Sequence, residues 1–452
     1  GRECRGFADE FLPDGADGRL FRPLWFKTYR YIQLDIETGA APLVVEDLYG
    51  IYTGYPFEVR GSFESDDPAL EKIWETGWRT ARLCAHETYF DCPYYEQLQY
   101  AGDTRIQALI SLYVSGDDRL VRKAIRMYDL SRSYEGITCS RYPSHIPQYI
   151  PPFSLYWIGM IHDYWMHRSD DAFVRSFLPG IRTVLSWFTE KIDPHTGLLK
   201  NGLPHWNFTD WATSWERGIA PESDSSGSAI TTLQLAAALD DAADLMRRYD
   251  RPAEAKEYAA ISAGLKKNVY EKCWDASKGL LRDYIGSPTY SQHVNIMGIL
   301  TDAIPHKDQR AVFERIDSDP SLTQTTFYYK FYLIRALKKL GLADRYTEML
   351  GPWQQMIDIG LTTFAETPEP TRSDCHAWSS SPNYDLLATV CGVEPASPGF
   401  ATVRIAPHPG RLKQIKGVVP HPQGDITVEL QRDGDILSGQ VALPGQLTGD
   451  FV

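Results

Sequence analysis

The sequence predicts a mainly α-helical protein in which one large helical domain is flanked by β-sandwich segments. Three observations support this fold class. Apolar residues recur at helical spacing from residue 68 to residue 391, the flanking stretches alternate like strands, and 43% of the 452 residues are hydrophobic, enough for a large core. We expect residues 1–64 to be the C-terminal part of an N-terminal β-domain, residues 65–392 the helical domain, and residues 393–452 a truncated C-terminal β-sandwich domain.

The first part is predicted to contain strands. Residues 25–34 and 51–55 are rich in aromatic and β-branched side chains, which favour extended backbone. The chain opens at Gly1 in a polar, turn-rich stretch without a signal-peptide pattern. We therefore expect the native chain to extend further upstream.

The helical domain begins at Asp67, which precedes Pro68 in a pattern typical of a helix N-cap. Helices are expected over residues 68–88, 103–114, 118–131, 153–168, 171–191, 227–249, 252–271, 291–303, 308–315, 325–340, 342–358 and 381–391. Several are apolar on more than one face, as residues 153–166 are, which is typical of helices packed between other helices. Their number fits a closed ring of six helical hairpins, and an open helical solenoid stays an alternative.

Two long loops interrupt the predicted helices, and after Gly392 the spacing of apolar residues changes from helical to strand-like. Residues 89–100 and 201–228 are longer than most connections in compact domains, and loops of that length usually carry function. Past Gly392, residues 402–405, 425–430 and 436–443 alternate like strands between prolines.

Composition and charge exclude several classes of protein. Lysine and arginine number 46 against 59 aspartates and glutamates, so the net charge is −13 and argues against a nucleic-acid or anionic-membrane partner. No apolar stretch is long enough to span a membrane, so we expect a soluble protein. The seven cysteines are widely spaced and indicate neither a disulfide framework nor a metal cluster. The compartment, cytoplasmic or exported, and the oligomeric state stay open.

One acidic motif resembles a magnesium site. Asp240, Asp241 and Asp244 match the DDxxD pattern of helical prenyl-transfer enzymes. They lie beside an apolar stripe and lack a second acidic motif downstream, so we interpret them as an ordinary solvated helix face. Signatures of nucleotide-binding proteins, zinc proteases and serine hydrolases are also absent from the sequence.

Residues 89–105 are the densest mixture of acids and aromatic side chains, with Asp91, Glu96 and Asp103 among them. Aromatic faces pack against the C–H surface of a sugar while carboxylates accept from its hydroxyls. A carboxyl group set against aromatic side chains also holds its proton more firmly, which suits a general acid. The structural alternative has equal weight: Asp103 caps a helix, Asp91 pairs with Arg105, and Glu96 is solvated.

A second acid, Glu366, follows the end of a predicted helix in a loop held extended by prolines. His376 and Trp378 come one short loop later. The alternative is a rigid turn with a hydrogen-bonded, purely structural histidine.

Residues 205–216 form a third segment, with three tryptophans in a loop. Trp206 and Trp211 either stack on a sugar or plug the end of the helical domain. Asp210 and Glu216 are candidate hydroxyl acceptors or spare catalytic carboxylates.

These residues together resemble the bacterial α-L-rhamnosidases of glycoside hydrolase family 78, as a divergent member. The resemblance rests on Asp91-Cys92-Pro93, on Glu96, and on Gly102-Asp103 seven residues after that glutamate. It implies an (α/α)6 toroid between β-domains. It also implies that Glu96 is the general acid, that Glu366 in its Thr-Thr-Phe-x-Glu context is the general base, and that Asp91, Asp103 and His376 bind rhamnose.

The sequence departs from the commoner pattern of that family near Glu96. Tyr94-Tyr95 replace a Gln-Arg stretch, Gln97 stands where arginine is usual, and Tyr100 replaces a sugar-stacking tryptophan. Asp210-Trp211 resembles the Gly-Asp-Trp of the family. With the resemblance, the expected substrate-binding set is completed by Tyr100, Trp206, Asp210, Trp211 and Trp378.

The reaction that the resemblance implies is exo-hydrolysis of terminal α-L-rhamnose with inversion. Protonated Glu96 donates its proton to the leaving oxygen, and ionised Glu366 accepts a proton from the attacking water. The two carboxyl groups are then expected to lie roughly 6.5–9.5 Å apart. The substrate is a carbohydrate, and neither a metal nor an organic cofactor is required. Two alternatives stay open: an exo-glycosidase of the same fold acting on another sugar, and a non-catalytic glycan-binding homologue. A polysaccharide lyase is disfavoured, because the segment around Glu96 is acidic rather than positively charged.

Overall fold

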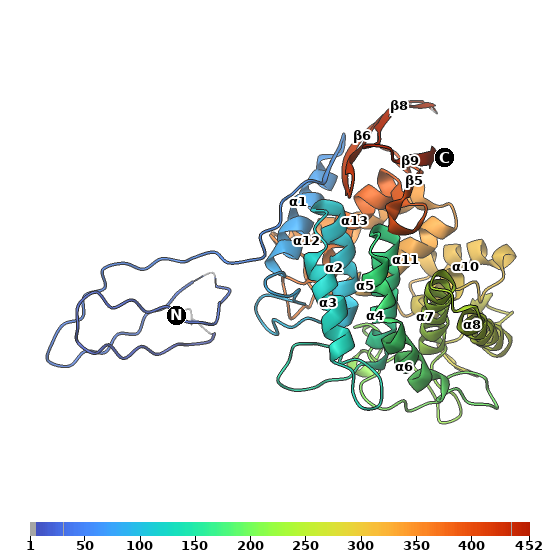
Figure 1. The fold of residues 1–452 in the computed structure, drawn as a ribbon, viewed down its shortest axis with the longest axis horizontal. Coiled ribbons are helices and arrows are strands. Elements are labelled where there is room, and N and C mark those ends of the chain that lie inside the picture. The colour runs from blue at the N-terminus through green and yellow to red at the C-terminus, as the bar shows by residue number, and fades with distance from the viewer. Residues whose placement is uncertain (1–5, 30, 435) are drawn as a thin grey trace.

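The computed structural model describes residues 6–29, 31–434 and 436–452. A helical body carries strands along one edge, and the N-terminal segment leads away from it as an extended arm (Figure 1). The mainly helical fold class predicted from the sequence is confirmed.

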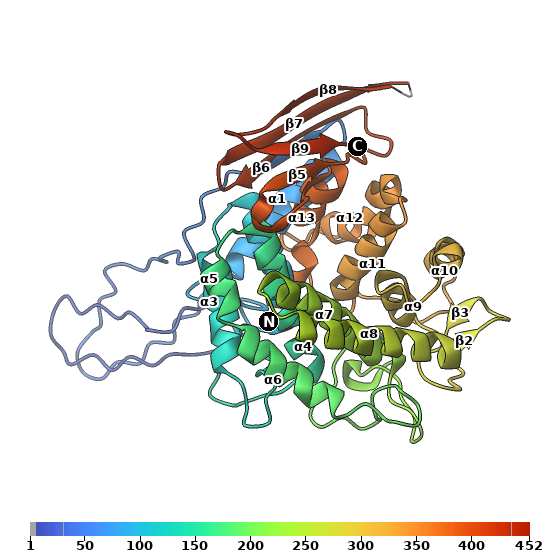
Figure 2. The ribbon, with the colours of Figure 1, turned by 45° about the vertical axis from the view of Figure 1, so that its right-hand side comes forward.

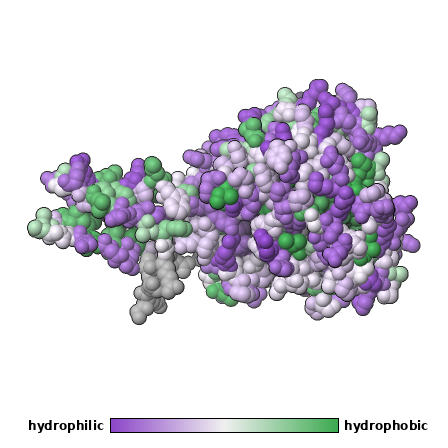
Figure 3. Space-filling view, turned by 90° about the horizontal axis from the view of Figure 1, so that it is seen from below, coloured by the Kyte–Doolittle hydropathy of each residue, from purple (hydrophilic) through white to green (hydrophobic). Residues whose placement is uncertain are grey.

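The N-terminal arm differs from its prediction. Residues 6–29 and 31–61 contain neither helix nor strand, so the strands expected over 25–34 and 51–55 do not form among the described residues; residue 30 lies outside them. A strand needs partners for its backbone groups and a covered face, and most of this segment has neither. Its apolar side chains, such as Leu24 and Tyr31, therefore stay exposed, and they gather visibly on the arm in Figure 3.

The helices follow the predicted ranges closely. They are α1 (Pro68–Leu83), α2 (Ala101–Val114), α3 (Arg119–Leu130), α4 (Pro151–His167), α5 (Asp171–Arg175), α6 (Leu178–Thr189), α7 (Ala229–Arg248), α8 (Pro252–Cys273), α9 (Gln292–Leu300), α10 (His306–Ser318), α11 (Phe327–Lys339), α12 (Gly351–Asp358) and α13 (Pro382–Asp385). Short 3-10 turns lie at η1 (Glu216–Gly218), η2 (Ala343–Leu350), η3 (Ala377–Ser380) and η5 (Pro398–Phe400), and a π turn at η4 (Leu386–Val390).

Caps and prolines account for the boundaries. The Asp67 side chain accepts from Ala69 N at 2.9 Å, as expected of an N-cap before Pro68. The helix predicted over 171–191 is instead two helices, because Pro179 in the first turn of α6 has no N–H to continue a helix from α5. Pro352 has the same effect between η2 and α12.

The helices alternate between an inner and an outer position. Every residue of α2 except Arg105 is buried, and α4, α7, α9 and α11 are also buried over most of their surface. Helices such as α3, α8 and α10 bury only one face. Successive helices therefore pair as outer and inner members of hairpins, the helical toroid that Figure 2 shows from the side. No helix among the described residues is long and apolar enough to cross a membrane.

The ring closes where α1 meets α13. Asn383 Nδ2 donates to the Trp74 carbonyl at 2.9 Å. Gly77 lies against the same asparagine, in a space that holds no Cβ. The first and last hairpins are thus neighbours, although they are separated by the whole helical domain.

The chain after Gly392 folds into two sheets. The larger, antiparallel sheet has the order β1 (Ser62–Ser65), β6 (Gln414–His421), β7 (Gly424–Asp433) and β8 (Ile436–Ala442). The smaller has the order β4 (Val393–Pro395), β5 (Thr402–Ile405) and β9 (Thr448–Phe451), with β5 and β9 parallel. β1 lies in the part of the chain expected to belong to the N-terminal β-domain, yet it pairs with β6 of the C-terminal sheet. A separate two-stranded ribbon joins β2 (Trp274–Asp275) and β3 (Leu280–Leu281).

Replacing Gly77 with alanine tests how much the ring depends on its closure. The new Cβ would overlap the Asn383 side chain and crowd Phe364, so we expect destabilisation of about 1–3 kcal/mol from overpacking. Gly264→Ala is the matched helical control, because a Cβ there meets no atom within 4 Å. Thermal unfolding should give a lower Tm for Gly77→Ala and an equal or higher Tm for Gly264→Ala. Equal Tm values for Gly77→Ala and the unmodified protein would contradict tight packing at the closure.

Candidate active site

The loop between α1 and α2 presents Glu96. The Asp91 carboxylate accepts from Leu98 N at 3.1 Å and from the Cys92 thiol at 3.2 Å, which folds residues 91–98 into a compact turn. Glu96 N donates to Cys92 Sγ at 3.4 Å, and Gln97 adopts a positive φ of 54°. Glu96 therefore stands at the tip of a turn whose shape is set by buried polar contacts.

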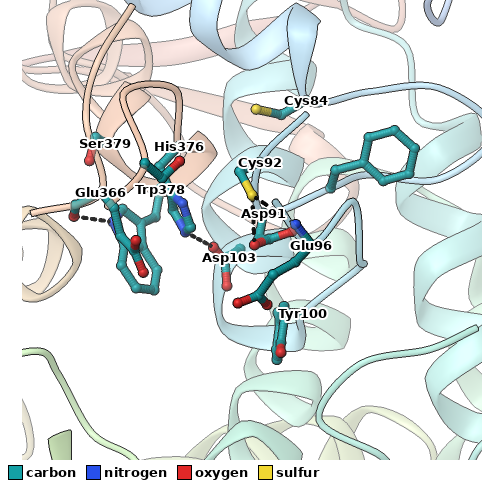
Figure 4. Close-up of polar contacts among 12 residues, drawn as sticks. Cys84, Asp91, Cys92, Glu96, Tyr100, Asp103, Glu366, His376, Trp378 and Ser379 are labelled. Carbon is teal, nitrogen blue, oxygen red and sulfur yellow. Dashed lines mark hydrogen bonds and ion pairs between the residues drawn. The ribbon is translucent and has the colours of Figure 1, made fainter. Parts of the chain in front are cut away.

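The second loop, residues 359–376, presents Glu366. Its backbone N donates to the Ser373 carbonyl at 2.9 Å, and its carbonyl accepts from Trp378 Nε1 at 2.8 Å. Ala377 N donates to the Asp91 carbonyl at 2.9 Å, which ties the two acid-bearing loops together. Figure 4 shows the side chains of the two loops facing one another.

Nine of the ten predicted site residues line a single pocket. These nine are Asp91, Glu96, Tyr100, Asp103, Trp206, Trp211, Glu366, His376 and Trp378. Ile150, Phe153, Phe208 and Arg372 complete the lining. The three segments chosen from the sequence thus converge on one pocket.

Asp210 is the exception, and its expected contact with substrate is corrected. Its side chain is fully buried and accepts from His293 Nε2 at 2.7 Å, from Thr326 N at 2.9 Å and from the Thr326 hydroxyl. A buried carboxylate needs such donors to offset its lost hydration. Asp210 therefore anchors the 201–228 loop to α9 and α11, and Glu216 is exposed outside the pocket lining.

The structural alternatives for the acidic residues do not match the observed contacts. Arg105 pairs with Asp163 at 2.8 Å rather than with Asp91. Asp103 lies in the first turn of α2, where it contacts His376 Nε2 at 3.2 Å instead of capping the helix. Glu96 is paired with an arginine rather than being free in solvent.

Aromatic side chains form the walls of the pocket. Trp378 stacks on Tyr328 with ring centroids 4.6 Å apart and contacts the His376 ring at 4.4 Å. Across the pocket, Trp206 and Trp211 pack on Phe208 at 5.3 and 5.0 Å. The tryptophans therefore pack against the domain and also line the pocket.

Burial changes the pKa values of the polar residues at the floor of the pocket, which are Asp91, Asp103 and His376. It raises the pKa of Asp91 to about 7, with Glu96 and Asp103 adding to the effect and His376 opposing it. Burial likewise raises the pKa of Asp103 against the opposing influence of His376. For His376, burial acts to lower the pKa, but the neighbouring Asp103, Cys92 and Glu366 together outweigh it and the pKa is raised. An imidazolium beside Asp103 thus faces a carboxyl group, Asp91, that is able to hold a proton.

Two features of the site are not among the residues chosen from the sequence. Arg372 Nη2 lies 2.9 Å from Glu96 Oε1 and 3.5 Å from Glu366 Oε1. Those two oxygens are therefore at most the sum of these distances, about 6.4 Å, apart. The only signal for Arg372 in the sequence is its place as a cation between Glu366 and His376.

The N-terminal arm is the other feature. Trp25 Nε1 donates to Gln97 Oε1 at 2.6 Å and the Thr28 hydroxyl to the Pro93 carbonyl at 2.8 Å. Phe26 stacks on His86 at 4.2 Å. Residues 25–28 thus brace the loop that carries Glu96.

Ligand atoms for a metal are engaged in other contacts. Asp91, Cys92 and His376 place potential ligand atoms within 4.8 Å of one another, but the Cys92 thiol is bonded to Asp91 and His376 to Asp103. In the DDxxD motif, Asp240 pairs with Lys266 and Asp244 with Arg247, outside the pocket lining.

Two of the similar solved structures are rhamnosidases. The chain superimposes on the GH78 family rhamnosidase of Bacillus sp. GL1 with a TM-score of 0.80 and 28% identity, over 88% of this chain and 44% of that one. For the rhamnosidase from Klebsiella oxytoca with rhamnose bound, the TM-score is 0.64 and the identity 22%, over 75% of this chain and 66% of that one.

Sequence comparison gives the same family. The chain is 21% identical to an alpha-L-rhamnosidase of Alteromonas sp. (strain LOR), over 98% of this chain and 50% of the relative, so it spans about half the length of that relative. The bacterial alpha-L-rhamnosidase C-terminal domain matches residues 392–450, and the bacterial alpha-L-rhamnosidase 6 hairpin glycosidase domain matches residues 58–390. Because the latter match covers well over half of the chain, the chain belongs to the six-hairpin glycosidase family of bacterial alpha-L-rhamnosidases.

Proposed function

We propose that this chain carries the catalytic site of an α-L-rhamnosidase that releases terminal α-L-rhamnose with inversion. The observation that carries the proposal is the meeting of Glu96 and Glu366, from the first and last hairpins, across one pocket with aromatic walls. Family membership supports the choice of sugar. An exo mode of action is part of the same proposal.

The two glutamates divide the proton transfers between them. Glu96, protonated, donates to the glycosidic oxygen as the bond to the anomeric carbon breaks. Glu366, ionised, accepts a proton from a water that attacks the same carbon from the opposite face, so the configuration inverts. The backbone contacts of Glu366 with Ser373 and Trp378 fix the direction of this base.

The remaining pocket residues bind the sugar. Asp91, Asp103 and His376 offer acceptors and donors for its hydroxyls at the buried end of the pocket. Trp206, Trp211 and Trp378, together with Tyr100, pack against its apolar faces. Asp210 acts indirectly in this proposal, by holding the loop that carries two of the tryptophans.

Separate Glu96→Gln and Glu366→Gln variants test the proposal. Each amide keeps the shape of the carboxyl group but neither donates nor accepts the required proton, so we expect kcat on an aryl α-L-rhamnoside to fall by at least about a hundredfold. Glu369→Gln is the matched control, an exposed glutamate in the same loop as Glu366, and should keep normal turnover. NMR of the first product should show the inverted anomer.

Three outcomes would overturn parts of this proposal. Near-normal turnover in both Glu96→Gln and Glu366→Gln would remove the assignment of acid and base. Hydrolysis of a different aryl glycoside alone would change the sugar, and binding of L-rhamnose without turnover would make the chain a glycan-binding protein.

Asp91→Asn tests the protonation of the buried floor. With a pKa of about 7 in the folded protein against an ordinary value of 3.8, Asp91 contributes stability below pH 4 that is lost as pH rises toward 7. The asparagine stays neutral, so the Tm of the variant relative to the unmodified protein should rise by about 2 °C or more between pH 5 and pH 8. Asp358→Asn, an exposed control at the end of α12, should show no such trend. A flat difference for Asp91→Asn would contradict the raised pKa.

A further inference from the structure

Arg372 occupies the space between the two glutamates. The same nitrogen, Nη2, contacts Glu96 at 2.9 Å and Glu366 at 3.5 Å. Partial burial acts to lower the pKa of Arg372, but the charges of Glu366 and Glu96 outweigh it and the pKa is raised, so the group is a permanent cation. Its side chain is 48% exposed, and its guanidinium lies 5.6 Å from the centre of the Tyr95 ring, which is itself exposed.

This position conflicts with the reaction. In a single displacement the anomeric carbon and the attacking water lie between the acid and the base, where the guanidinium now lies. The acid must also carry a proton, whereas a cation at hydrogen-bond distance favours the ionised carboxylate. Both carboxylates are held toward the same guanidinium nitrogen, so their facing oxygens are at most about 6.4 Å apart.

The surroundings allow the guanidinium to leave. The Arg372 side chain is half exposed and gives up little packing when it turns into solvent, whereas the Glu366 carboxylate that it leaves is only 6% exposed. The backbone of the loop is held independently, by Glu366 N on the Ser373 carbonyl and by the Thr363 hydroxyl on the Asp374 carbonyl. The Tyr95 ring offers a cation–π contact at the mouth of the pocket.

We propose that Arg372 is a positioning residue that bridges the two glutamates, and that the sugar displaces it as it binds and thereby allows Glu96 to take up the proton that it donates. This inference rests on the proposed function. As the sugar binds, both ion pairs break, one proton passes from solvent to the Glu96 carboxylate, and Glu366 stays ionised as the base. Arg372 thus couples occupancy of the pocket to the protonation state that catalysis needs.

The other groups that face Glu96 do not replace this cation. Asp91 on its own loop, Asp103 on α2 and Glu366 opposite are acids, and negative charge on them favours a proton on Glu96 once Arg372 has left. Tyr100 is neutral, with its hydroxyl bonded by Arg141 at 2.8 Å. The charge of His376 is directed at Asp103. The departure of the Arg372 guanidinium therefore makes the electrostatic surroundings of Glu96 more negative.

Calorimetric titration with L-rhamnose at pH 7, in buffers of different ionisation enthalpy, measures the protons taken up on binding. The unmodified protein should take up close to one proton per site. Arg372→Met, which keeps the length of the stem without the charge, should take up less than half as much, because binding then displaces no cation from Glu96. It should also bind L-rhamnose about three- to tenfold more tightly, since no ion pair is broken.

Two further variants separate this role from a structural one. Arg345→Met removes a guanidinium that likewise bridges two carboxylates, Glu314 and Asp317, outside the pocket lining, and should behave like the unmodified protein. Arg372→Lys restores a cation and should recover most of the proton uptake.

The outcomes distinguish the two proposals. Equal proton uptake in Arg372→Met and the unmodified protein would overturn this inference, as would a rhamnose-soaked crystal with the guanidinium still between the glutamates. If the unmodified protein binds no L-rhamnose and hydrolyses no aryl α-L-rhamnoside, the proposed function fails and this inference fails with it. Normal hydrolysis with equal uptake overturns only the role of Arg372.

Discussion

The candidate site depends on the closure of the helical ring. Glu96 follows the first helix of the ring and Glu366 precedes the last, so the two meet only because α1 packs against the end of the domain. The Thr80 hydroxyl reinforces this closure, since it accepts from Phe364 N at 2.9 Å while donating to the Thr76 carbonyl at 2.8 Å. The bond from Ala377 N to the Asp91 carbonyl then transmits the closure to the acid-bearing loops. The spacing of the glutamates therefore depends on the packing of α1.

Once the ring is closed, the charge of the pocket becomes the next constraint. Four carboxyl groups, those of Asp91, Glu96, Asp103 and Glu366, line one small space, and their mutual repulsion in a poorly hydrated environment is costly. Different groups offset this cost at different carboxylates. His376 pairs with Asp103, and the Leu98 N–H and the Cys92 thiol donate to Asp91. Arg372 bridges Glu96 and Glu366. The groups that compensate Asp91 and Asp103 are themselves buried, whereas the Arg372 side chain is half exposed.

Features that depend on residues close together in the sequence were predicted well, and features that depend on distant residues were not. Helices such as α4 and α7 were predictable, because apolar spacing and caps are local signals. The site residues were accessible where a motif placed acids beside aromatic side chains, as around Glu96. Asp210 shows the limit: an acid between tryptophans has the same local pattern whether it faces a sugar or, as here, the buried His293 and Thr326.

The N-terminal arm and Arg372 were beyond local reasoning for another physical reason. β-branched and aromatic residues over 25–34 favour extended backbone, but whether extended backbone becomes a strand depends on partners elsewhere. The contacts of Trp25 and Thr28 with the 91–98 turn join segments about 65 to 72 residues apart. Arg372 is a single charged residue, and its role depends on contacts with two glutamates that are far apart in the sequence and that only the fold brings to either side of it.

These contacts also give a physical reason for the unusual sequence around Glu96. The commoner family pattern that this segment resembles has arginine in the stretch where Tyr94-Tyr95 and Gln97 stand here. In this protein the arginine beside Glu96 comes from the opposite loop, the Tyr95 ring lies near its guanidinium, and Gln97 instead accepts from Trp25 of the arm. A cation on the same loop as the acid would move with it, whereas a cation on the opposite loop is able to leave while the acid stays in place. The substitutions near Glu96 therefore fit a site in which the charge that balances the acid is removable.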